Sequence, residues 1–427
     1  MCILKTVSEE LWHDSDVLRV QAETIALILY FCCRTFAAHL WIHCHHRSGL
    51  SHHDLYAIDG LHEDAPRPPC VVGLDAAGVV ESAGSAVSHV KPGDRVIVLR
   101  PYGVHSDRIV VAGTAVFKMP EQMSFVEAGA FAYDFLSAYL LLFRVARISP
   151  GDTVLVRDAC DGVSIAVAQL CRCVPNVRVL GTGHKLSALE ARNQGFETLM
   201  EEGKTDVVAE TLRRTGNRGV QLLLDQCRGG ESDMVKFGAA IAPLGMHVVF
   251  EGGAYLKTHE TRYMGLQRKS LHPFEPLTDR TNKAAARFEL VDWLRTAPPH
   301  EIRNAMGVVL ELYRRGYARP QVDSVTTFAD APAAFARLAG GLNFGRVLLA
   351  PEPLPASEPV AASAPRPTAP AVTTCGLVPT IAMELERGGE AGAMAAVAAG
   401  GAGAVVPPTG ASEASARGGG RGAGAPA

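Results

Sequence analysis

In the first third of the chain, apolar residues occur in short runs of the kind that form β-strands. Between residues 73 and 99, short apolar runs are separated by glycine turns. Pro92-Gly93-Asp94 then marks a tight turn between two of these runs. Short strands joined by tight turns predict an antiparallel β unit in this part of the chain.

After Gly151 the rhythm changes to short apolar runs that alternate with segments of helical periodicity. The runs predict strands at 154–156, 177–180, 220–224 and 247–250. The intervening segments predict helices at 163–172, 186–193, 209–214 and 233–241. Such alternation predicts a parallel sheet with right-handed crossovers. Later segments predict helices at 305–314 and 331–338 and a closing strand at 345–349.

The two ends of the chain have a different character. Residues 351–427 are rich in Ala, Pro and Gly and bury too little apolar surface to offset the entropy of ordering, so we expect a disordered tail. Near the start, residues 25–33 are apolar, but Arg34 ends this run well short of the roughly 20 residues that a bilayer span needs. We expect no secretory signal, and a helix rather than strands up to Arg47.

Composition sets limits on the class of protein. The 427 residues suffice for two or three domains, and a net charge of −3 gives no reason to expect a nucleic-acid partner. Ten cysteines without metal-ligand spacing are typical of reduced thiols in the cytoplasm.

Three motifs occur in a characteristic order: GLDAAGVVESAG, VKPGDRV and EAGAFAYDFLSAYLLLFRVARISPGDTVLV. With them, residues 48–350 resemble the medium-chain dehydrogenase/reductase superfamily, quinone oxidoreductase subfamily. The later run RPQVDSVTTFADAPAAFARLAGGLNFGRVLL is most similar to the vesicle amine transport (synaptic vesicle membrane) protein homologues. The resemblance implies an α/β fold, with a GroES-like β-barrel domain and a Rossmann doubly wound parallel sheet.

The resemblance also implies a division of the chain. We expect an atypical N-terminal segment at 1–47 and the first part of the GroES-like catalytic domain at 48–135. The Rossmann nucleotide-binding domain would cover 136–265. Residues 266–350 would return to the catalytic domain, and the tail would begin at 351.

Zinc-dependent members of the superfamily carry a cysteine and a histidine as catalytic zinc ligands. The matching positions here hold Ser51 and Leu74, which cannot replace a thiolate and an imidazole. The four-cysteine structural lobe of the family is missing too. The sequence therefore predicts no zinc. A group of histidines could bind a metal, but no carboxylate or cysteine has a suitable spacing, so solvated or partly buried imidazoles are the expectation. These histidines are His43, His45, His46, His52, His53 and His62.

The resemblance places a dinucleotide-binding turn at residues 159–164, where the family typically reads AAGGVG. Gly162 and Val163 are retained, but Asp161 replaces the first glycine and Ser164 the last. A carboxylate about 5 Å from a phosphate repels it by roughly 3 kcal/mol at an effective dielectric constant near 20. That energy corresponds to about a hundredfold loss of affinity. The turn therefore predicts NADPH binding that is weakened.

Other cofactor positions follow from the resemblance. Ser137 and Asn343 match residues beside the nicotinamide, and Phe250 ends a strand where ligands bind in this fold class. No acid ends the second strand, so four residues are expected to face the 2′-phosphate of NADPH, with a solvated loop as the alternative. They are Thr182, His184, Lys185 and Ser187. A family tyrosine after the next strand is replaced near Glu202.

Tyr56 is the candidate catalytic residue, because it matches a substrate-site tyrosine of bacterial quinone reductases and a phenol can donate to a quinone oxygen. The alternative is a core tyrosine. The sequence thus favours a zinc-independent NADPH-dependent oxidoreductase acting on a quinone or reactive carbonyl. A catalytically degenerate relative that binds membranes, lipids or proteins stays open. The resemblance further suggests a homodimer and a peripheral association with vesicle or mitochondrial outer membranes.

Overall fold

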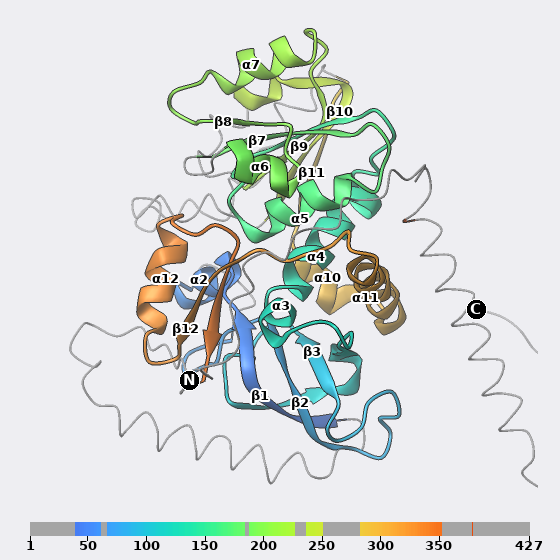
Figure 1. The fold of residues 1–427 in the computed structure, drawn as a ribbon, viewed down its shortest axis with the longest axis vertical. Helices are drawn as coiled ribbons and strands as arrows, with labels where there is room; N and C mark the ends of the chain where they lie inside the picture. The colour runs from blue at the N-terminus through green and yellow to red at the C-terminus, as the bar shows by residue number, and fades with distance from the viewer. Residues whose placement is uncertain are drawn as a thin grey trace, which may run out of the picture. The chain divides into compact units, whose positions relative to one another are not determined.

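The computed structural model describes residues 39–60, 66–183, 188–226, 236–250, 282–351 and Val378. By its internal contacts the chain divides into two units, residues 1–385 and 386–427. Every described residue belongs to the first unit, and the described residues are drawn in colour in Figure 1.

A seven-stranded sheet forms the β-rich part of the described chain, with the order β12-β13-β1-β2-β3-β5 and β4 paired to β1 (Figure 1). Neighbouring strands are antiparallel except β12 and β13, which are parallel. Its strands are β1 (His39–Gly49), β2 (Asp75–Ala83), β3 (Arg95–Leu99), β4 (Arg108–Ala112), β5 (Val116–Lys118), β12 (Val322–Thr327) and β13 (Arg346–Ala350). The closing strand predicted at 345–349 is β13.

Strand β1 corrects one expectation. The sequence up to Arg47 predicted a helix, whereas His39–Gly49 is a strand that pairs with β2, β4 and β13. Its place between three partners satisfies its backbone groups, so pairing across the sheet overrides the local apolar pattern. The β-rich part therefore takes in residues 39–47 as well. The other predicted domain boundaries remain predictions, and residues 1–38 lie outside the described part.

A six-stranded parallel sheet follows, in the order β11-β10-β9-β6-β7-β8. Its strands are β6 (Thr153–Val156), β7 (Arg178–Thr182), β8 (Thr198–Met200), β9 (Val220–Asp225), β10 (Ile241–Phe250) and β11 (Ala284–Phe288). Counted along the chain, this is the Rossmann order 3-2-1-4-5-6. The strand order reverses between β6 and β9, and ligands of such sheets bind at the carboxyl ends of the strands near that reversal.

Helices flank both sheets. They are α2 (His52–Ile58), α3 (Phe125–Gly129), α4 (Ala132–Tyr139), α5 (Gly162–Cys171), α6 (Ala188–Gln194), α7 (Val207–Arg214), α10 (Leu290–Thr296), α11 (Pro299–Arg314) and α12 (Ala331–Ala339), with the 3-10 turn η2 (Gly113–Ala115) and the π-helical turn η3 (Leu140–Val145). Five predicted helices match α5, α6, α7, α11 and α12. Of the helix predicted at 233–241, residues 236–238 are helical, residues 233–235 lie outside the described part, and Ile241 already begins β10.

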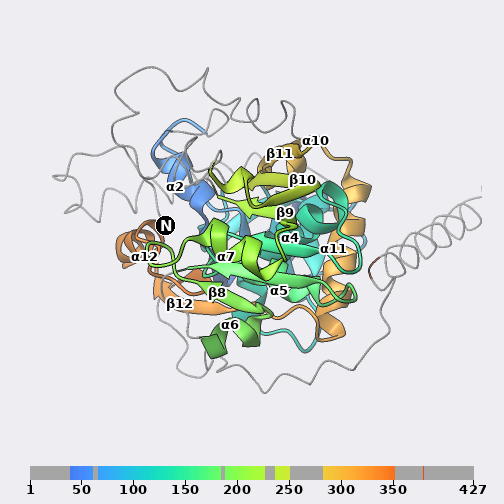
Figure 2. The same cartoon turned by 90° about the horizontal axis from the view of Figure 1, so that it is seen from above.

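The main hydrophobic core joins α4, α5 and α11 to residues of both sheets, and α11 packs against α4 (Figure 2). The Phe131 ring stacks on Phe135 with centroids 4.8 Å apart and meets the Tyr313 ring edge-on at 5.6 Å. Two residues of the predicted disordered tail are described, Pro351 and Val378, and Val378 is helical and 3% exposed against this core.

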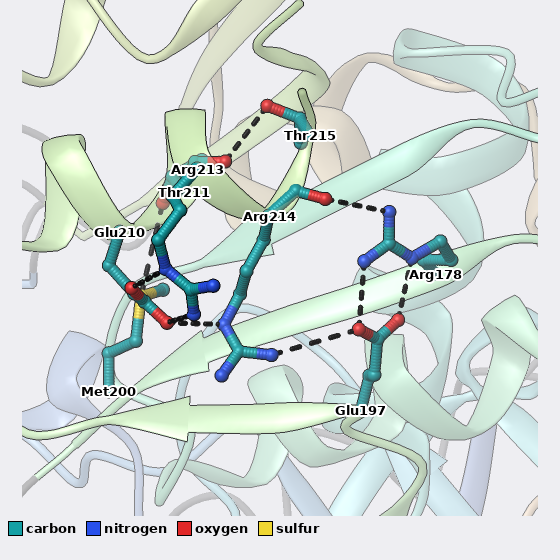
Figure 3. Close-up of polar contacts among 8 residues, drawn as sticks. All are labelled: Arg178, Glu197, Met200, Glu210, Thr211, Arg213, Arg214 and Thr215. Carbon is teal, nitrogen blue, oxygen red and sulfur yellow. Dashed lines mark hydrogen bonds and ion pairs between the residues drawn. The ribbon is translucent and has the colours of Figure 1, made fainter. Parts of the chain in front are cut away.

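An ion-pair network fixes α7 to the amino ends of β7 and β8 (Figure 3). Arg178 donates two bonds to the Glu197 carboxylate, at 2.6 and 2.8 Å, and a third to the carbonyl oxygen of Arg214 at 3.2 Å. Glu210 accepts from Arg213 and Arg214 in turn. These pairs lie at the opposite edge of the sheet from the carboxyl ends, which leaves that edge for a ligand.

None of the helices in the described ranges combines the length and the apolar character needed to cross a membrane. The apolar run at 25–33 lies outside those ranges.

Candidate functional site

The turn between β6 and α5 is capped by its own carboxylate. Asp161 is the N-cap residue of α5, and its Oδ2 accepts from the Val163 N–H at 3.0 Å. Asp161 is 7% exposed. The helix N-terminus is where a diphosphate would bind. The backbone of Val163, a predicted cofactor residue, is therefore already bonded to the side chain that the sequence identified as the main obstacle.

A second acid lies beside this turn. A Cβ atom at Gly162 would collide with the Asp134 carboxylate, so the predicted cofactor glycine accommodates Asp134 of α4. Arg346 of β13 donates to Asp134 Oδ1 and to Asp75 Oδ1, each at 2.9 Å. Burial raises the pKa of Asp134 to about 8, with Asp161 and Asp75 adding to the rise and Arg346 opposing it. Asp134 and Asp75 thus share one guanidinium, and Asp161 lies close enough to Asp134 to raise its pKa.

The sequence missed this cluster. Arg346 and Asp134 are 212 residues apart, so spacing gave no sign of the contact. The available signals were weak: Asp134 is an acid within an apolar run, and Asp75 stands in the GLD motif beside the position of the missing zinc histidine.

A polar network links residues at the carboxyl ends of β6, β7 and β9. The Thr182 hydroxyl, at the end of β7, donates to Glu202 Oε1 at 2.5 Å. Arg157 donates to Glu202 at 3.4 Å and to Asp225 at 3.2 and 3.3 Å. Its guanidinium lies 4.0 Å from the centre of the Phe237 ring. Arg157 follows β6 and Asp225 ends β9, so their ion pair sits where the strand order reverses.

Two buried hydroxyls lie near the turn. Ser137 on α4 and Ser164 in the first turn of α5 are 2% and 0% exposed, and among the described residues neither hydroxyl has a hydrogen-bond partner. Ser137 lies on the same helix as Asp134, whose carboxylate borders Gly162. Unpaired buried hydroxyls are costly, so both are candidates for hydrogen bonds to a bound ligand.

Of the remaining predicted site residues, Asn343 is the one held beside the turn. Its side-chain amide donates to Gly345 O at 2.9 Å, and the Gly345 N–H donates to Cys160 O at 2.8 Å. These two bonds hold the loop against the 159–164 turn. Phe250 is fully buried in the main core. Tyr56 lies in α2 and is 6% exposed. His184, Lys185 and Ser187 lie outside the described residues.

Ser51, which stands at the position of the family's zinc cysteine, caps a helix. Ser51 is the N-cap of α2, and its hydroxyl donates to Asp54 Oδ2 at 2.9 Å, while Asp54 Oδ1 accepts from the Gly73 N–H at 2.8 Å. Leu74 is fully buried in the main core. Within the described ranges, no three or more His, Cys, Asp or Glu side chains group to hold a metal. Of the clustered histidines, His52 and His53 are buried, and the side chains of His43, His45, His46 and His62 are outside the described part.

Asp54 also belongs to a buried Ser-His-Asp chain. His105 Nδ1 lies 2.9 Å from the Ser48 hydroxyl, and its Nε2 lies 3.6 Å from Asp54. Burial opposes ionisation of Asp54, but His105 outweighs it and keeps the pKa of Asp54 below its ordinary value. All three residues are at most 3% exposed, so this chain supports the fold rather than hydrolysis of a substrate.

A Rossmann sheet joined to a GroES-like β domain defines a medium-chain dehydrogenase/reductase. Residues 41–132 match the family model of the alcohol dehydrogenase GroES-like domain. The chain is 33% identical to the human synaptic vesicle membrane protein VAT-1 homolog over 311 residues, which cover 71% of this chain and 77% of that protein. It is 32% identical to the zebrafish (Danio rerio) homolog over 315 residues, covering 73% of this chain and 64% of that longer relative.

Solved structures agree. The human VAT-1 homolog-like protein superposes with a TM-score of 0.62 at 29% identity, covering 74% of this chain and 90% of that one. The Escherichia coli quinone oxidoreductase complexed with NADPH gives a TM-score of 0.63 at 21% identity, covering 74% and 92%, and so supports the fold alone. The chain therefore belongs to the VAT-1 homologues, in the quinone oxidoreductase subfamily of the medium-chain dehydrogenase/reductase superfamily.

Proposed function

We propose that this protein is a zinc-independent oxidoreductase that uses a reduced nicotinamide dinucleotide to reduce a quinone or a reactive carbonyl. The observation that carries the proposal is the Rossmann-ordered sheet, in which α5 begins at Gly162 directly after the turn that follows β6. That arrangement presents a helix N-terminus at the edge where dinucleotides bind in this fold class.

The residues present fit such a cofactor in part. Ser137 and Ser164 offer buried hydroxyls that have no hydrogen-bond partner within the described part of the chain, and the Asn343 loop is held against the same turn by the Gly345–Cys160 bond. Asp161 fits a diphosphate poorly, because its carboxylate occupies the N-terminus of α5. For binding, Asp161 would have to turn away from the Val163 N–H, and this requirement supports weak rather than absent affinity.

The chemistry asks little of the chain beyond positioning. The nicotinamide, when bound, supplies the hydride. Tyr56 is our candidate for donating a hydrogen bond to the acceptor oxygen of the substrate. NADPH is the form of the cofactor that the family resemblance supports, and the E. coli quinone oxidoreductase was crystallised with it. We further propose a cytoplasmic protein that associates peripherally with vesicle or mitochondrial outer membranes and forms homodimers.

Cofactor titration tests the proposal. The full-length protein is titrated with NADH and with NADPH while its melting temperature and the nicotinamide fluorescence are recorded. Saturable stabilisation by at least one dinucleotide, followed by quinone-dependent oxidation of that cofactor, is the expected result. No change in either signal at millimolar concentrations of both dinucleotides would rule the enzyme out.

The second candidate function is that of a catalytically degenerate relative that acts through membrane, lipid or protein binding. The acids at the start of α5 favour it, because Asp161 caps the helix and Asp134 lies against Gly162. The same titration separates the two functions, since a degenerate relative would bind neither dinucleotide.

A further inference from the structure

We propose that Glu202 selects the form of the cofactor, so that the protein takes NADH in preference to NADPH. In this inference, which rests on the proposed function, Glu202 accepts from the 2′-hydroxyl of the adenosine ribose and repels a 2′-phosphate. It departs from the NADPH that the family resemblance supports.

Placement is the first step. Strands β7 and β8 are parallel neighbours, and the Gly183 N–H donates to Met200 O at 3.1 Å, which holds their carboxyl ends together. Glu202 follows β8 by two residues, and its carboxylate accepts from the Thr182 hydroxyl at the end of β7. A carboxylate at the end of the second Rossmann strand is the group that binds the ribose hydroxyls of NAD. The sequence showed no acid within that strand, and the structure supplies one from the next.

Charge is the second step. Arg157 is the cation bonded to Glu202, and it is shared with Asp225, which is 1% exposed. Among the described residues of this network, two carboxylates share one guanidinium, and the neutral form of His247, whose Nε2 lies 3.3 Å from Asp225 Oδ2, adds no charge. The Glu202 side chain is 28% exposed, so a ligand can approach it from solvent. A 2′-phosphate placed there would meet the carboxylate, whereas a 2′-hydroxyl could donate to it.

The test compares wild type with two variants of matched charge change. Glu202→Gln removes the carboxylate that contacts Thr182 and Arg157. Glu201→Gln removes its neighbour, which is 46% exposed and pairs with Lys204. Dissociation constants for NADH and NADPH are measured by nicotinamide fluorescence on the full-length proteins. We expect wild type to bind NADH more tightly. Glu202→Gln should shift the NADH/NADPH affinity ratio toward NADPH by about tenfold, since exposure screens part of the repulsion. Glu201→Gln should leave the ratio unchanged.

The outcomes separate this inference from the proposed function. If wild type binds NADPH more tightly than NADH, or if both variants give the wild-type ratio, the inference is overturned while the oxidoreductase stands. If none of the three proteins binds either dinucleotide, the proposed function fails, and the selectivity fails with it. Should Glu202→Gln not fold, the wild-type ratio and Thr182→Val, which removes the hydroxyl that positions the carboxylate, still decide.

Discussion

At the scale of single residues, the Asp161 carboxylate occupies the N-terminus of α5, where a dinucleotide phosphate would bind. Asp161→Asn keeps a good N-cap and removes the charge, since Asn and Asp are comparable at this position. We expect NADH to bind about tenfold to a hundredfold more tightly, in line with the loss of a phosphate–carboxylate repulsion of roughly 1.4–3 kcal/mol. Binding is measured by fluorescence titration and stability by thermal melting.

Asp161→Ala is the companion variant, because it removes both charge and cap. It should lose about 1 kcal/mol of stability, the usual cost of an N-cap replaced by Ala, yet gain affinity as the Asn variant does. Equal affinity in wild type and Asp161→Asn would mean that the charge of Asp161 is not the obstacle.

Asp134 makes stability depend on pH. Burial raises its folded pKa to about 8 from an ordinary 3.8, so between these values the folded state holds a proton that the unfolded state has lost. The free energy of unfolding should therefore fall as pH rises through this window, by at most about 1.4 kcal/mol per pH unit. Asp134→Asn should remove that slope in chemical denaturation curves recorded from pH 5 to about 8. If the wild-type advantage instead grew as pH rose, Arg346 would be stabilising an ionised Asp134.

At the scale of elements, the sequence predicted those strands whose own residues are apolar. The runs for β6, β7 and β9 are buried on both faces of a parallel sheet and were found from hydrophobicity alone. Strands β8 and β11 were not found: Thr198–Met200 is three residues long, and Ala284–Phe288 is rich in alanine. They are strands because their backbones pair with the outer edges of β7 and β10. The hydrophobic pattern of a segment does not reveal such pairing.

In the candidate site too, contacts between sequence neighbours could be predicted and long-range contacts could not. The 159–164 turn and its acid Asp161 could be predicted, because a strand, a turn and a helix adjoin in the sequence. The Arg346 contacts with Asp134 and Asp75 could not, because they join β13 to α4 and β2 across 212 and 271 residues. Glu202 was noted as a substitution, but only the pairing of β7 with β8 brings it to Thr182.

The junction of β1 with α3 depends on the absence of a side chain. A Cβ at Gly49 would lie 2.7 Å from Gly129 O and 2.8 Å from Asp75 Oδ1, too close for either atom. Gly49→Ala should therefore destabilise the protein by about 1–3 kcal/mol, the usual cost of overpacking. Gly183→Ala is the control for stability, since its nearest new contact, Cys160 Sγ at 3.4 Å, is ordinary. Similar melting temperatures for the two variants would show that β1 can move away from α3.

At the scale of the whole molecule, two parts of the C-terminal region should differ in how much they stabilise the fold. Val378 is 3% exposed and packs in the core that also holds Phe131 and Leu310, whereas residues 386–427 form a unit of their own. Truncation after Leu385 should leave the melting temperature unchanged. Truncation after Pro351 removes Val378 and should lower the melting temperature by a few degrees, since each kcal/mol corresponds to about 2–4 °C for 150–250 residues and to less for a longer chain. Val378→Ala in the full chain should give part of that loss, about 1–2 kcal/mol, through the lost apolar burial and the remaining cavity. Differential scanning calorimetry of the three proteins beside wild type checks this order. Equal melting temperatures for the two truncations would mean that the core is complete at β13 and that Val378 adds nothing to it.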